Sequence, residues 1–265
     1  MSYTGVKAIL EGQEHPEGER EDIRALCFLM KEAAAILKEK RRKRGAIDFD
    51  FPESKIIVDD KGYPIDIHPY ERNVATDIIE DFMLLANETV AEDYFWQEIP
   101  FLYRTHETPD SDKIKKLDTF IHNFGYYMKT GRENFHPKEI QKLLFSLEGE
   151  PEEPLISRLA LRSMKQAKYT TLNVGHFGLS TQYYTHFTSP IRRYPDLQIH
   201  RIIKENIHGK LNQKRLEHYE AILPSVAQQS STMERRAQDA EREVDKLKKV
   251  AVSYTHLTLP TKRIV

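Results

Sequence analysis

The chain has 265 residues with 40 basic and 41 acidic side chains, so its formal net charge is −1. That balance argues against a protein that coats nucleic acid nonspecifically, although it allows a localised basic surface. Hydrophobic residues make up 39% and aromatic residues 10%, which excludes a disordered chain, and no apolar run reaches the roughly 20 residues of a membrane span.

The first patterned segment, residues 20–44, predicts a helix because its apolar residues recur at helical spacing. We expect Gly45 to end this helix as its C-cap. The segment closes on the basic run KEKRRKRG, which either compensates the helix dipole in solvent or faces phosphate. The one cysteine, Cys27, lies in the apolar pattern. A buried, inert thiol without a disulfide partner fits a protein of the reducing cytoplasm.

The remaining pattern predicts a small sheet among many helices. In residues 46–51 and 55–68, β-branched residues alternate around Asp60-Lys61-Gly62 and predict a hairpin. Helical periodicity or Pro at a first turn predicts six further helices, and one segment is expected to be extended. The helices are 73–99, 110–127, 137–147, 152–167, 195–207 and 212–249, the last with a bend near Pro224, and the extended segment is 182–188. The fold class is therefore α+β, a small sheet or hairpin with a helix-rich remainder.

The C-terminal end departs from this pattern. The helical repeat of MERRAQDAEREVDKLKKV stops at Val250, and the Thr-rich stretch that follows resembles translated sequencing-adapter read-through. We therefore treat residues 1–250 as one folded portion and residues 251–265 as a non-native tail.

Two arginines stand between two prolines in TSPIRRYPD, residues 188–196. Pro190 and Pro195 restrict the backbone on both sides of Arg192 and Arg193. The planar fork of a guanidinium matches phosphate oxygens, and the next helix adds backbone N–H groups and positive dipole. Thr188 and Ser189 add hydroxyl groups to the same stretch. Together these features predict a site that holds a phosphodiester. The alternative is a structural clasp in which arginine pairs with Asp196.

A different chemistry is suggested by the histidines around the same stretch. Asp196 and His200 are four residues apart and would share a helix face, as pairs of metal ligands do. His176 and His186 lie ten residues apart, and no HExxH run is present. A histidine satisfied by the core competes with a metal ligand at each position. A His/Asp metal hydrolase therefore remains an alternative, as does a noncatalytic, helix-rich module that binds RNA or another partner.

The stretch HFGLSTQYYTHFTSPIRRYPDLQIH, residues 176–200, resembles without a gap the signature of the ribonuclease II/ribonuclease R (RNB) family of exoribonucleases, nearest to its bacterial ribonuclease R branch. Four further motifs agree: RGAIDFDFPE (44–53), IIEDFMLLANETVA (78–91), IPFLYRTHE (99–107) and LALRSMKQAKY (159–169). The resemblance covers about residues 1–250. It implies a hydrolytic, monomeric 3′→5′ exoribonuclease that degrades single-stranded RNA to nucleoside 5′-monophosphates with Mg²⁺ or Mn²⁺.

The resemblance also implies roles for individual residues. Arg192 matches the family's catalytic arginine, which contacts the phosphate at the scissile end. Phe49 aligns with an aromatic residue that stacks on the 3′-terminal base, and Glu80 with a carboxylate that meets the terminal ribose. The alternatives are a core residue at an edge strand for Phe49 and a solvated helix position for Glu80. The arginine stretch contributes the other expected RNA contacts: Thr188, Ser189, Arg193 and Tyr194.

One part of the family pattern is missing. The family's metal site is an aspartate cluster in the first half of the catalytic domain, and the motifs above belong to the later part. The local acids lack the family's spacing: Asp48, Asp50, Asp59 and Asp60. We therefore expect no metal ligands in this chain, a partial RNB catalytic domain, and no activity from the chain by itself.

Overall fold

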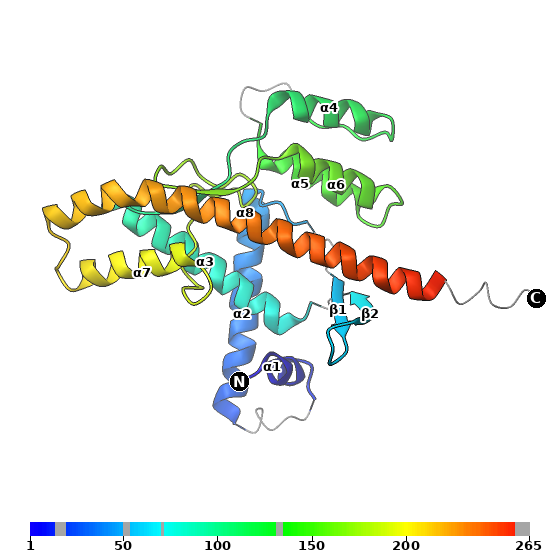
Figure 1. Cartoon of the computed structure of the whole chain (residues 1–265), viewed down its shortest axis with the longest axis horizontal. Helices are drawn as coiled ribbons and strands as arrows, with labels where there is room; N and C mark the ends of the chain where they lie inside the picture. The colour runs from blue at the N-terminus through cyan, green and yellow to red at the C-terminus, as the bar shows by residue number, and fades with distance from the viewer. Residues whose placement is uncertain (14–19, 50–53, 70–71, 131–134, 258–265) are drawn as a thin grey trace, which may run out of the picture. The chain divides into compact units, whose positions relative to one another are not determined.

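A computed structural model describes residues 1–13, 20–49, 54–69, 72–130 and 135–257. The chain divides into two compact units (Figure 1). The first unit comprises residues 1–49 and 73–230, and the second comprises residues 50–72 and 231–265. No helix among the described residues is both long enough and apolar enough to cross a membrane.

Helices dominate the first unit, and one short sheet accompanies them. The strands β3 (Tyr103–Thr105) and β4 (Lys168–Thr170) are antiparallel, with Arg104 opposite Tyr169. Together with the hairpin of the second unit, this sheet confirms the α+β class. The helices of the first unit are α1 (Tyr3–Leu10), α2 (Glu21–Arg44), α3 (Val74–Trp96), α4 (Ser111–His122), α5 (Pro137–Leu147), α6 (Glu153–Ser163), α7 (Tyr194–Ile207) and the first part of α8 (Gln213–Leu257).

The described residues of the first unit form three clusters of buried apolar side chains. One joins the C-terminal half of α3, β3, β4, α7 and the first part of α8, and it includes Leu102, Ile199 and Leu223. A second fills the space among α4, α5 and α6, which Figure 1 shows together in green. The third lies among α1, α2 and α3, and it contains Cys27, which is 2% exposed. The buried thiol predicted from the sequence is confirmed.

The end of α2 follows the expected capping chemistry. Gly45 takes a left-handed conformation with φ of 105°, and its N–H donates to the carbonyls of Arg41 and Arg42. Only glycine adopts this conformation without a steric cost from a Cβ atom. The basic run before it is not simply solvated, because Arg41 pairs with buried Asp81 of α3 and Arg44 pairs with Glu88 of the same helix.

The second unit contains the predicted hairpin. Strands β1 (Ser54–Val58) and β2 (Pro64–Pro69) are antiparallel, and the side chain of Asp59 accepts hydrogen bonds from the N–H groups of Lys61 and Tyr63 in the turn. Residues 46–49, which were expected to extend this β region, form no strand. The Asx-type turn at Asp59 therefore organises the hairpin locally.

One other sequence prediction is corrected and one is refined. Residues 182–188, predicted to be extended, join no β-ladder, and isolated bonds hold them: Arg104 N–H donates to the Tyr184 carbonyl (2.9 Å), and the Thr185 hydroxyl donates to the Leu102 carbonyl (2.7 Å). Helix α8 continues through Pro224 and past Val250 to Leu257. The expected helix end at about residue 249 is therefore wrong. Residues 258–265 lie outside the described part of the chain.

The buried amide of Gln141 provides a test of how α2 is joined to α5. Its Nε2 donates to the carbonyls of Arg42 (2.9 Å) and Ala46 (2.8 Å), on either side of the Gly45 cap. We predict that Gln141→Leu lowers the free energy of unfolding by about 1–3 kcal/mol, because two partly buried carbonyls lose their donor. Urea unfolding of the chain measures this. Gln213→Leu at an exposed site is the matched control, and an equal loss there would contradict the role of Gln141.

Candidate functional site

The arginine stretch forms a closed turn before α7. The carbonyl of Ser189 accepts from the N–H of Arg192 (3.3 Å) and from the N–H of Arg193 (3.1 Å). Helix α7 then begins at Tyr194, with Pro195 in its first turn as the sequence predicts. Proline is tolerated there because an N–H at that position has no partner within the helix. The backbone around Arg192 is therefore held on both sides.

Asp196 holds the side chain of Arg193. Its carboxylate accepts from Arg193 Nη2 (2.7 Å) and Nε (2.9 Å), and it also accepts from the N–H of Ser189 (2.8 Å). Asp196 is completely buried at 0% exposure, and the Arg193 side chain is 20% exposed. This is the Arg–carboxylate clasp that the sequence offered as an alternative. It applies to Arg193 and leaves Arg192 out.

Arg192 has the opposite environment. Its side chain is exposed, beside Ile191, which is fully exposed. Within the described part of the chain, the Arg192 guanidinium has no hydrogen bond or ion pair. One arginine of the pair thus belongs to the structure and the other presents an uncompensated, planar set of donors to solvent. Such a group suits the oxygens of a phosphate.

The remaining predicted contacts occupy three places. Thr188 and Ser189 are half-buried in the turn, and Tyr194 is half-exposed at the start of α7, with its hydroxyl 3.4 Å from the Gln198 side chain. These three therefore flank Arg192 along the chain. Phe49 is half-buried and packs against the cluster of α4, α5 and α6. Glu80 lies exposed on α3, and its RNA contact, like that of Phe49, stays a prediction.

A set of neutral rings lies close to the turn. His186 Nδ1 is 2.8 Å from the Tyr169 hydroxyl, and the His186 ring packs edge-on against Tyr184. Burial lowers the pKa of His186 to about 2, and the positive charges of Arg193 and Arg104 add to this effect. Burial likewise lowers the pKa of His176 to about 3. Both imidazoles are neutral at neutral pH, so they add no cation beside the two arginines.

The histidines do not form the metal site that the alternative interpretation requires. His200 stacks on Phe187 with ring centroids 4.4 Å apart, and its Nε2 lies 2.8 Å from the Phe187 carbonyl. Asp196 is bound to Arg193, while the His176 Nδ1 accepts from the N–H of Leu179 (3.2 Å). Throughout the described ranges, no group of three or more His, Cys, Asp or Glu side chains could hold a metal ion. The residues in these ranges therefore do not fit a catalytic divalent cation.

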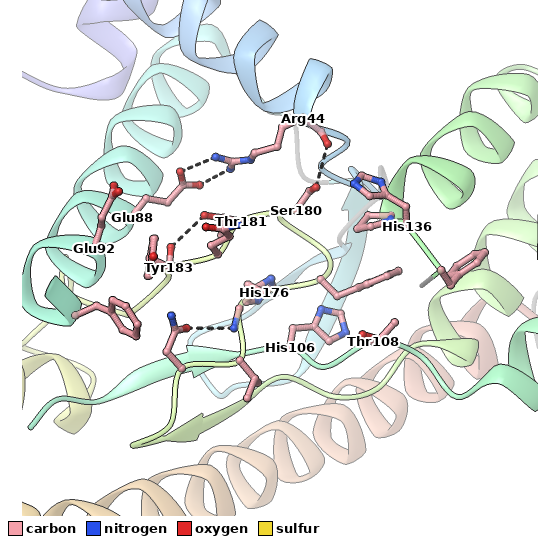
Figure 2. Close-up of a pocket in the computed structure, with 18 residues that line it drawn as sticks. Arg44, Glu88, Glu92, His106, Thr108, His136, His176, Ser180, Thr181 and Tyr183 are labelled. Atoms are coloured by element: carbon pink, nitrogen blue, oxygen red, sulfur yellow. Dashed lines mark hydrogen bonds and ion pairs between the residues drawn. The ribbon is translucent and has the colours of Figure 1, made fainter. Parts of the chain in front are cut away.

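A cleft of about 950 Å³ lies between α3 and the loop of residues 173–183. Figure 2 shows Arg44 joined to Glu88 on one side and the neighbouring rings of His106 and His176 on another. Arg44 donates to both Glu88 oxygens (2.9 and 2.6 Å), while its own carbonyl accepts from the Ser180 hydroxyl (3.0 Å). No local sequence pattern links residues 44 and 88, so the sequence does not predict this pairing.

The RNB-domain model matches residues 1–209 of the chain. The chain belongs to the RNB-domain family. Ribonuclease R 1 of Lactococcus lactis is 43% identical over 257 residues, which cover 97% of this chain and 32% of that protein. Ribonuclease R of Thermotoga maritima is 41% identical over 260 residues, 97% of this chain and 36% of that protein. The chain thus spans about a third of the length of these curated relatives.

A solved structure of an RNB-family protein supports the fold. Mycoplasma genitalium RNase R, in complex with ribose-methylated single-stranded RNA, superposes with a TM-score of 0.89 at 25% identity, covering 95% of this chain and 39% of that one. The resemblance and fold class expected from the motifs are confirmed. Family motifs also contain the residue that holds the 182–188 segment: Asn87 of α3 accepts from the N–H of Phe187 (2.9 Å) and donates to the Tyr184 hydroxyl (3.2 Å).

The neutral His186 predicts a specific acid sensitivity. Its pKa is lowered in the folded state, so below the ordinary value of about 6.5 the unfolded chain binds the proton and the folded chain does not. The buried imidazole therefore does not affect the free energy of unfolding above that pH. Below it, the imidazole lowers the free energy of unfolding as the pH falls, by up to about 1.4 kcal/mol per pH unit. We predict that His186→Gln flattens the slope of unfolding free energy between pH 7.5 and 5.5.

Urea unfolding across that pH range, with His218→Gln as the control for the replacement itself, measures the slope. An unchanged slope in the His186 variant would contradict a buried neutral imidazole.

Proposed function

We propose that this chain provides the phosphate-binding part of a hydrolytic 3′→5′ exoribonuclease that degrades single-stranded RNA to nucleoside 5′-monophosphates. One observation carries the proposal: Arg192, in the family signature, is exposed and pairs with no residue in the described ranges, while the other arginine of the turn is neutralised by Asp196. The relatives named ribonuclease R support the activity. Structures of Mycoplasma genitalium RNase R with single-stranded and with double-stranded RNA support RNA as the substrate.

The turn suits one end of an RNA strand. Arg192 would donate to the phosphate under attack, and the first N–H groups of α7 would add positive potential beside it. Stacking of a base on an aromatic ring contributes about 1–3 kcal/mol per base and is indifferent to sequence, which is the role proposed for Phe49. A carboxylate that accepts from a 2′-hydroxyl distinguishes RNA from DNA, which is the role proposed for Glu80. Thr188, Ser189, Arg193 and Tyr194 are proposed as supporting contacts.

We also propose that the reaction depends on Mg²⁺ or Mn²⁺ held by carboxylates in the part of the relatives that this chain does not match. Asp48, Asp59 and Asp60 are exposed and join no group that could hold a metal among the described residues, and Asp50 lies outside them. A cytoplasmic, monomeric enzyme, with residues 1–250 as native sequence and 251–265 as a foreign tail, completes the proposal.

The role of Arg192 can be separated from simple affinity for RNA. If its guanidinium stabilises charge that develops on the phosphate, its loss removes an interaction that is strongest in the transition state. We predict that Arg192→Ala in the full-length protein slows single-turnover cleavage on the order of 100–1000-fold, while RNA affinity changes far less. Arg192→Lys should rescue poorly, because an ammonium lacks the planar fork.

Single-turnover cleavage and equilibrium binding are measured for both variants, with Arg158→Ala on the exposed face of α6 as the matched control. Equal loss of binding and cleavage in Arg192→Ala would show that the arginine only holds the strand.

The proposed reaction itself predicts a product pattern. The full-length protein with Mg²⁺ or Mn²⁺ should shorten 5′-labelled single-stranded RNA stepwise from its 3′ end and release nucleoside 5′-monophosphates. The chain of residues 1–265 should show no turnover above background, because electrostatic stabilisation at the scissile bond also needs the metal carboxylates. Gel analysis and chromatography of the nucleotides measure both. Internal cleavage, equal activity on DNA, or metal-dependent degradation by the isolated chain would contradict the proposal.

A further inference from the structure

The completely buried carboxylate of Asp196 touches neither solvent nor the proposed phosphate position, yet it accepts three hydrogen bonds within the turn. We propose that Asp196 is a positioning residue for Arg192: it closes the turn and neutralises Arg193, so that Arg192, which has no ion pair with any residue that the structure describes, is held outward. This inference rests on the proposed function, because it concerns the residue that would contact the phosphate.

Asp196 closes the turn through the backbone of Ser189. Asp196 Oδ1 accepts from the Ser189 N–H (2.8 Å), and the Ser189 carbonyl accepts from the N–H groups of Arg192 and Arg193. Both polar groups of the Ser189 backbone are thus bound to residues on the far side of the loop. Arg192 lies inside this ring of bonds, so its Cα position depends on the carboxylate although its side chain does not touch it.

Asp196 also neutralises the positive charge of Arg193. Asp196 binds Arg193 in a bidentate geometry, which uses the planar fork and leaves neither oxygen unpaired. The other groups that act electrostatically on Arg193 include Tyr169 and Tyr184. Among the residues that the structure describes, no other acid is hydrogen-bonded to the Arg193 guanidinium. Without Asp196, a largely buried cation would have no counter-ion, and the turn would have to open or rearrange to solvate it.

The rate of cleavage depends on the position of the Arg192 guanidinium relative to the phosphate. A catalytic donor displaced by about 1 Å can lose on the order of 100-fold in rate, because alignment with the reacting phosphate is lost while general affinity persists. Asp196 therefore acts on turnover through Arg192. A purely structural pair would lower the melting temperature without this selective effect.

A double-mutant cycle in the full-length protein tests the inference. Single-turnover cleavage of 5′-labelled single-stranded RNA and equilibrium binding are measured for wild type, Asp196→Asn, Arg192→Ala and the double variant, below the melting temperature of each. We expect Asp196→Asn to slow cleavage by about 30- to 100-fold with RNA affinity nearly unchanged. In the Arg192→Ala background the same substitution should cost less than about threefold, because the group that it positions is already gone.

The matched control lies on the same helix. Glu205, near the C-terminal end of α7, binds Arg215 in a bidentate geometry (2.9 and 2.8 Å), as Asp196 binds Arg193 near the N-terminal end. Glu205→Gln should lower the melting temperature but leave single-turnover cleavage near the wild-type rate. If Asp196→Asn does not fold, Arg193→Lys retains the charge without the fork and enters the same cycle, with the same loss of effect expected in the Arg192→Ala background.

The outcomes separate the inference from the proposed function. A wild-type protein that releases no nucleotides from RNA defeats the proposed function, and the positioning role with it. An active wild type whose rate is unchanged by Asp196→Asn overturns the positioning role alone. The role is also overturned if the substitution costs the same factor with and without Arg192, because independent effects multiply.

Discussion

The buried carboxylate of Asp196 is the constraint on which the arginine turn depends. A carboxylate removed from water is tolerated only when ion pairing and hydrogen bonds replace its hydration. Here Arg193 and the Ser189 backbone provide all three bonds, and each of those donors is itself part of the turn. The pair does not need to add stability to matter. It fixes which conformation the loop adopts, because any arrangement that separates Arg193 from Asp196 leaves a buried charge unpaired.

Two buried histidines near that pair are neutral. His186 and His176 are kept uncharged by burial, and the nearby arginines favour the same neutral state. Asn87 holds the backbone that leads into the turn to α3. Within the turn, Asp196 neutralises Arg193, so Arg192 carries the positive charge that the turn presents to solvent.

Ion pairs also join α2 to α3 in the first unit. The basic end of α2 is joined to α3 through Arg41–Asp81 and Arg44–Glu88, and Arg44 is further bound to the 179–180 loop. Two cations of the run that suggested a phosphate-facing patch, Arg41 and Arg44, are thus used within the fold, whereas Arg42 and Lys43 are exposed. The cleft beside Arg44 and His176 is a consequence of this bridging between distant segments (Figure 2).

The amino-acid sequence by itself determined most of the helices, the Gly45 cap, the hairpin around Asp60-Lys61-Gly62, the buried Cys27 and the family, because each depends on local periodicity, turn chemistry or a contiguous motif. It also brought Arg192 and Arg193 together as candidates. Only the tertiary structure decided which of the two is free, since that depends on the complete burial of Asp196. The irregular 182–188 segment and the Arg44–Glu88 pair were likewise decided by packing between residues far apart in the chain. The prediction that the helix ends near Val250 was wrong, because the change in composition there does not stop helical hydrogen bonding.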